Sequence, residues 1–228
     1  MKNMSKIILI TLFTFLVCSK LPKDLFEAVT KGDVKGAQKL IEKQVDVNAT
    51  NEDGETALHR AIIAGQTSIA ELLIHNGANL NAQDKQGRSP LHLASFSTQV
   101  DIVDLLLQKG ADASIKDNIG ETALFTVIML GRLDIAKQLV QGGTDVNVKN
   151  ENGYTPLHKA AFWGQTDIAQ LLIQHGADIN AENNAGVTPL KVAINSNKTE
   201  VAELLRKHGA KFTEIETEAL RKMLKKSF

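Results

Sequence analysis

The sequence predicts an all-α repeat solenoid built of paired helices, and two observations carry this prediction. Five glycines stand 33 residues apart at the start of similar stretches, with no insertion between them. A second series of five glycines has the same spacing, and each member follows an amphipathic run such as QLLIQHG. Self-similarity at a fixed period of about 20 to 50 residues is the sequence signature of a solenoid. The two series are Gly54, Gly87, Gly120, Gly153 and Gly186, and Gly77, Gly110, Gly143, Gly176 and Gly209.

The first helix of each unit begins shortly after the leading glycine. A threonine or serine stands two residues after that glycine, where it is a natural N-cap. In three units a proline follows, at a helical position whose N–H has no intrahelical partner. Gly65, Gly131 and Gly164 then break the chain between the first and second helices. The expected N-caps and prolines are Thr56, Ser89, Thr122, Thr155 and Thr188, and Pro90, Pro156 and Pro189.

The second helix and the loop after it complete each unit. Leucine pairs recur on one helical face, and the glycine just past the last turn is the usual left-handed cap. An extended polar loop such as ADINAENNAG then leads to the next unit. It ends in dipeptides such as Asp53-Gly54 and Asn152-Gly153, which accept positive φ in a tight turn.

This unit resembles the ankyrin repeat, whose G-x-T-P-L-H-x-A-A-x-x-G core is matched almost letter for letter by Gly153 to Gly164. The resemblance covers roughly Leu21 to Phe212, and it implies ankyrin repeats made of paired antiparallel helices plus β-hairpin loops. We expect 33-residue units within 54–212, starting at residues 54, 87, 120, 153 and 186. Since the ends of a solenoid need a polar outer face, we expect an N-terminal capping repeat at 20–53 and a C-terminal capping helix at 213–228.

The first nineteen residues differ from the rest of the chain. Two lysines precede an unbroken run of apolar residues and threonines from Ile7 to Val17. This pattern predicts a secretory signal peptide at residues 1–19, cleaved before Lys20. Because the run is short for a bilayer span, we expect no membrane insertion after cleavage and a secreted or periplasmic location. With the resemblance, this favours an exported bacterial ankyrin repeat protein. Two alternatives stay open, namely an uncleaved membrane anchor and lipid attachment through Cys18.

Composition and motifs argue against nucleic-acid binding and against an enzyme. The chain has 26 basic and 26 acidic residues, so no charge excess points to nucleic acid. His59, His92 and His158 recur in one column, but Phe125 and Lys191 occupy the same slot in other units. The resemblance implies that these histidines are structural and bond the threonine hydroxyl and the backbone of adjoining units. Since no phosphate loop, CxxC, HExxH or GxSxG motif is present, we predict no catalytic residue, no metal site and no cofactor.

The candidate binding residues come from the columns that vary between units. The resemblance implies that protein partners bind the concave side, which the loop tips and the exposed edge of the first helices line. Phe96, Met129, Leu130, Phe162 and Trp163 would form a continuous apolar surface there. The sequence leaves open whether they form a binding hot spot or pack between neighbouring units. The predicted partner-binding residues are Arg88, Phe96, Met129, Leu130, Tyr154, Lys159, Phe162 and Trp163.

These observations predict an exported, non-enzymatic module for protein–protein interaction, present as a monomer. Its protein partner cannot be identified, because ankyrin surfaces accept proteins of many kinds. Two alternatives are a protective protein of the periplasm or envelope that acts on a small ligand or a metal, and a membrane-anchored scaffold.

Overall fold

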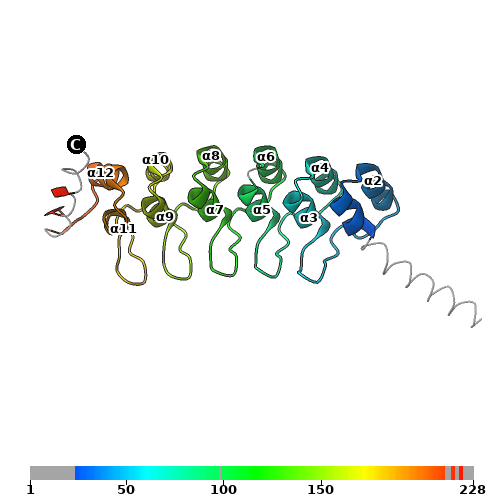
Figure 1. Ribbon diagram of the computed structural model, residues 1–228, viewed down its shortest axis with the longest axis horizontal. Coiled ribbons are helices and arrows are strands. Elements are labelled where there is room, and N and C mark those ends of the chain that lie inside the picture. The colour runs from blue at the N-terminus through cyan, green and yellow to red at the C-terminus, as the bar shows by residue number, and fades with distance from the viewer. Residues whose placement is uncertain (1–23, 98, 214–216, 219–220, 223–228) are drawn as a thin grey trace, which may run out of the picture.

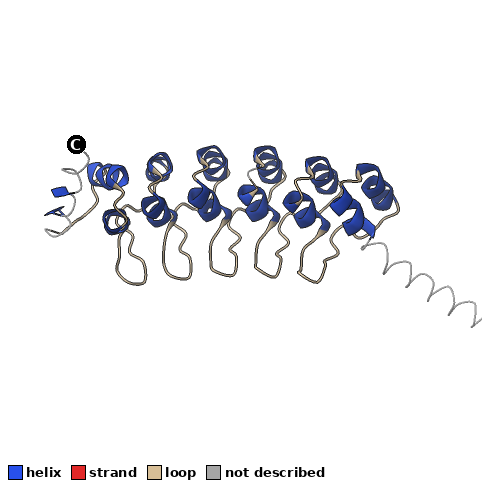
Figure 2. Cartoon of the chain, viewed as in Figure 1, coloured by secondary structure: helices blue, strands red, loops and turns tan. Residues whose placement is uncertain are grey.

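The computed structural model describes residues 24–97, 99–213, 217–218 and 221–222. Two rows of helices are stacked along one long axis, and loops project from the row of first helices (Figure 1). The part of the chain that the structure describes consists of helices and loops, without a strand (Figure 2). The predicted all-α repeat solenoid is therefore confirmed.

The first helices form the row next to the loops, and successive ones begin 33 residues apart. Each follows its predicted threonine or serine N-cap, whose backbone is extended. Gly131 and Gly164 end their helices in the left-handed conformation, and Asn197 adopts a φ of 54° at the corresponding place of the last unit. The first helices are α3 (Ala57–Ile63), α5 (Pro90–Phe96), α7 (Ala123–Leu130), α9 (Pro156–Trp163) and α11 (Pro189–Asn195).

The second helices form the opposite row and pack against the first helix of their own unit and against one another. Their apolar faces close a core that continues from unit to unit, as the fully buried Ile69, Ile102 and Ile135 illustrate. A helical segment at residues 24–31 precedes the row. The second helices are α2 (Val34–Glu42), α4 (Thr67–His75), α6 (Val100–Gln108), α8 (Leu133–Gln141), α10 (Thr166–Gln174) and α12 (Thr199–Lys207).

The loops are tight turns rather than paired strands. Within the described ranges, β pairing is limited to one isolated bridge between Thr50 and Thr56. Side chains take the place of a strand ladder: the Asn150 Oδ1 atom accepts the backbone N–H groups of Asn152 and Tyr154. Neighbouring loops are joined by one backbone hydrogen bond, as from Lys85 N–H to the Asp53 carbonyl. The β-hairpin character that the resemblance implied is therefore reduced to turns.

Two predicted terminal elements lie wholly or largely outside the described residues. The signal peptide at 1–19, with Cys18, is outside them, and so is most of the C-terminal helix at 213–228. Positions 217–218 and 221–222 of that helix are helical. Among the helices that the structure describes, none combines the length and the apolar character that crossing a bilayer requires.

Candidate functional site

The recurring histidines join one unit to the next, and both nitrogens of each ring are hydrogen-bonded. In α9 the His158 Nδ1 atom accepts the backbone N–H of Thr155 at 3.1 Å. The ring proton therefore belongs on Nε2, which donates to the Val187 carbonyl of the following unit at 2.8 Å. His59 and His92 make the equivalent bonds to the carbonyls of residues 88 and 121. Burial lowers the pKa of all three imidazoles, which are therefore neutral parts of the scaffold.

The predicted apolar side chains lie together on the last turns of the first helices and are exposed. The exposed fraction is 59% for Phe96, 45% for Met129 and 39% for Leu130. Phe162 and Trp163 are 49% and 45% exposed, and their rings meet edge to face with centroids 5.1 Å apart. These side chains are therefore exposed rather than enclosed between units, and their role in binding a partner stays a prediction.

One member of this surface was missing from the predicted set. Ile63, on the last turn of α3, is 42% exposed and occupies the same column as Phe96, Met129 and Phe162. Aligning the units was sufficient to find it. We call the complete set the apolar strip, which comprises Ile63, Phe96, Met129, Leu130, Phe162 and Trp163.

The three other predicted residues lie at the loop end of the first helices and not in the apolar strip. The Arg88 guanidinium pairs with the fully buried Asp84 carboxylate at 2.7 Å. Lys159 pairs with Glu121 of the preceding unit at 2.8 Å, and its Nζ atom is 5.9 Å from the centroid of the Tyr154 ring. Tyr154, which is among the predicted partner-binding residues, is half-buried and packs against the core.

A loop residue that the prediction did not include is also exposed and apolar. Ile119 lies at a loop tip with 55% of its surface exposed, in a column that holds Asp53, Gln86, Asn152 and Ala185 in the other units. Its backbone carbonyl accepts the N–H of the next loop. The signal for it was one large apolar residue in a column of polar or small residues.

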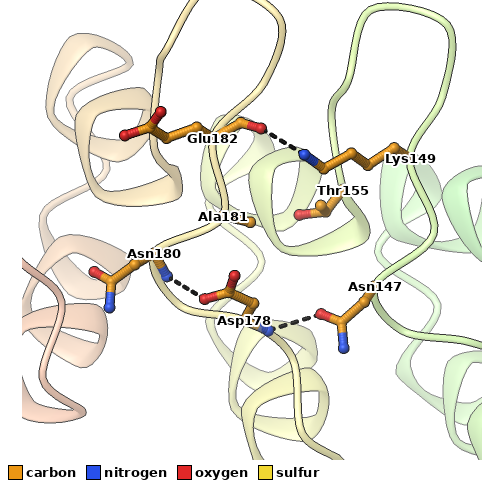
Figure 3. Close-up of a pocket in the computed structure, with 7 residues that line it drawn as sticks. All are labelled: Asn147, Lys149, Thr155, Asp178, Asn180, Ala181 and Glu182. Carbon is orange, nitrogen blue, oxygen red and sulfur yellow. Dashed lines mark hydrogen bonds between the residues drawn. The ribbon is translucent and has the colours of Figure 1, made fainter.

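A polar hollow of about 390 Å³ lies between two loops (Figure 3). The Lys149 Nζ atom donates to the Glu182 carbonyl at 2.8 Å, and the Asn147 Oδ1 atom accepts the Asp178 N–H at 2.7 Å. The Asp178 carboxylate in turn accepts the Asn180 N–H at 2.9 Å. Since these groups bond the backbone across or within loops, the hollow is part of the scaffold. The described residues contain no cluster of three metal-ligating side chains.

The comparisons with known proteins identify the repeat. A family model described as ankyrin repeats, in three copies, matches residues 25–117 and 124–216. No curated protein matches the chain.

Proposed function

Since the chain belongs to the ankyrin repeat family, we propose that it is a non-enzymatic module that binds a protein partner over the apolar strip. Ankyrin repeats generally mediate protein–protein interaction. The proposed face is the concave one, on the side of the first helices and loops.

The observation that carries this proposal is the continuity of exposed apolar groups across four successive units. A single exposed phenylalanine has no meaning, because folded proteins expose much apolar surface. Here the side chains stand at equivalent ends of helices that pack in sequence, α3 on α5, α5 on α7 and α7 on α9. A contiguous apolar patch rimmed by polar groups is typical of an interaction site, and aromatic anchors dominate the energy of such sites.

We further propose that the chain is exported as a monomer to the periplasm or beyond. The proposed export rests on the sequence of residues 1–19 alone. Intact-mass analysis of the exported form tests it, and the expected mature chain begins at or near Lys20. A mature chain that retains Met1 would contradict cleavage and favour the membrane-anchored alternative.

The binding proposal is tested by affinity purification with the full chain and with Trp163→Ala in parallel. A captured partner should bind the variant more weakly by about 2 kcal/mol or more, in the range typical of hot spots. Lys137→Ala, an exposed change on α8, is the matched control and should bind as the parent does. A partner that binds Trp163→Ala and Phe162→Ala as tightly as the parent chain would place the binding face elsewhere.

A further inference from the structure

We infer that the occupant of the apolar strip is an amphipathic α-helix with an acidic flank, lying along the stacking axis of the units. This inference rests on the proposed protein-binding function and adds the kind of partner. It is carried by the length of the apolar strip, by its period and by the charges beside it.

The apolar strip has a defined length. In the unit before that of Ile63, the positions equivalent to Ile63 and to the residue after it hold Thr30 and Lys31, which are exposed and polar. In the unit after that of Phe162 and Trp163, the equivalent positions hold Asn195 and Ser196. The apolar strip therefore ends at polar residues on both sides and spans three steps between units. Because packed helices are about 8–10 Å apart, three steps cover about 24–30 Å. An α-helix of about 16–20 residues has this length.

The period of the apolar strip matches a helix better than an extended segment. Seven residues of an α-helix rise about 10.5 Å, close to one step between units, and bring the same face back to the surface. Three residues of a strand rise about 10 Å, but residues three apart point to opposite faces. A bound strand could not offer an apolar side chain to every unit in one register. A bound helix could do so at each heptad and fill the space between with residues three or four positions away.

Cations lie beside the apolar strip, one turn nearer to the loops. Arg60 precedes Ile63 by three residues, and Lys159 precedes Phe162 by three residues, so each pair shares a helix face. Arg88 occupies the loop end of unit 87–119, the first of the two units between them.

In each of these cations' ion pairs the carboxylate is the less exposed partner. The exposed side-chain fractions are 35% for Arg60 against 9% for Glu55, and 31% for Lys159 against 17% for Glu121. Arg88 is 38% exposed, whereas its partner Asp84 is fully buried. A partner therefore meets N–H donors and positive charge along this edge. Carboxylates on the matching flank of a helix would complement them.

The test uses the full chain and three synthetic 21-residue peptides without tryptophan. The first carries leucines at heptad a and d positions and glutamates along one flank. The second has lysine for each of those glutamates, and the third differs from the first by two interior prolines. Binding is followed by titration calorimetry and by the fluorescence of Trp163, the only tryptophan. We expect the acidic peptide to bind about tenfold or more tighter than either of the others.

A charge-reversed chain provides the matched comparison. Arg60→Glu with Lys159→Glu should shift the preference toward the lysine peptide, whereas Lys109→Glu with Lys137→Glu, at exposed positions of the second-helix row, should leave it unchanged. Undiminished binding of the proline peptide, or tighter binding of the lysine peptide to the parent chain, would overturn the inference. If no peptide binds while a captured protein still depends on Trp163, the helical partner is wrong and the proposed function stands.

Discussion

Two neighbouring units, 120–152 and 153–185, share one backbone arrangement but are stabilised differently. In the second of them Thr155 caps α9 and His158 bonds the next unit. In the first, Phe125 occupies the histidine slot and is 2% exposed. The Thr122 hydroxyl and the Gln138 Oε1 atom are buried there without a hydrogen-bond partner among the described residues. The buried Phe125 ring thus takes the place of the histidine hydrogen bonds, and the Thr122 hydroxyl, which would bond a histidine there, has no partner in the part of the chain that the structure describes.

The comparison separates two kinds of position on the same helix. In the histidine column the inner units hold either histidine or the apolar Phe125, because their surroundings are closed, whereas Lys191 of the last unit is exposed. The column of the apolar strip changes from Met129 to Phe162 without a consequence for packing, since both side chains are about half exposed. Changes at the first kind of position should affect folding, and changes at the second kind should affect binding.

The largest expected effect contrasts two phenylalanines. Phe125→Ala should lower the free energy of unfolding by about 3–5 kcal/mol, because it removes a fully enclosed ring from between units. Phe162→Ala is the control and should change stability by less than about 1 kcal/mol, because half of its surface is already exposed. Chemical denaturation followed by circular dichroism measures both. An equal loss of unfolding free energy in Phe125→Ala and Phe162→Ala would mean that the Phe162 ring is part of the core.

A smaller effect should distinguish the two threonine caps. Thr155→Val removes a hydroxyl that bonds the His158 ring at 2.8 Å and caps the helix, so it should cost about 1–2 kcal/mol. Thr122→Val removes a hydroxyl with no such partner and should be neutral or slightly stabilising. The denaturation midpoints of the two variants, measured side by side with the parent chain, test this difference. A large loss of stability in Thr122→Val would show that the Thr122 hydroxyl makes a hydrogen bond.

A stabilising change of similar or smaller size is expected on α8. Gln138 occupies a column that holds Leu72, Leu105, Leu171 and Leu204 in the other units. Gln138→Leu should raise the free energy of unfolding by about 1 kcal/mol, because it replaces an unsatisfied buried amide oxygen by apolar contact. The reverse change, Leu171→Gln, should lower stability. No gain from Gln138→Leu would indicate that the amide is hydrated.

The histidine column predicts a gradual dependence of stability on pH. Burial lowers the pKa of His59, His92 and His158 in the folded chain below the ordinary value of 6.5. The unfolded chain therefore binds more protons as pH falls through that value. Stability should be complete above about pH 6.5 and should decline as the pH falls further toward the folded pKa values. Denaturation midpoints between neutral and mildly acidic pH measure this decline. His92→Ala should be less stable at neutral pH and should show a shallower decline, and an equally steep decline in that variant would point to other groups.

The sequence predicted most of the fold, because recurring letters report closed surroundings. The caps Thr56 and Thr155, the left-handed glycines and the histidine links follow from local rules or from the resemblance, and each is present. The exposure of the apolar strip could not be predicted, because a residue type does not show what packs over it: Phe125 in the histidine column is 2% exposed, whereas Phe162 in the column of the apolar strip is 49% exposed. The half-buried position of Tyr154 likewise does not follow from its residue type.

The central claim is that the apolar strip is exposed and binds a protein partner. The fluorescence of Trp163 tests this claim most directly. It is the only tryptophan of the chain and 45% exposed, so emission of the free protein should be red and readily quenched by iodide or acrylamide. Addition of a captured partner should shift the emission to the blue and protect it from quenching. Blue, protected emission from the free monomer, or emission that stays red in the complex, would contradict the account.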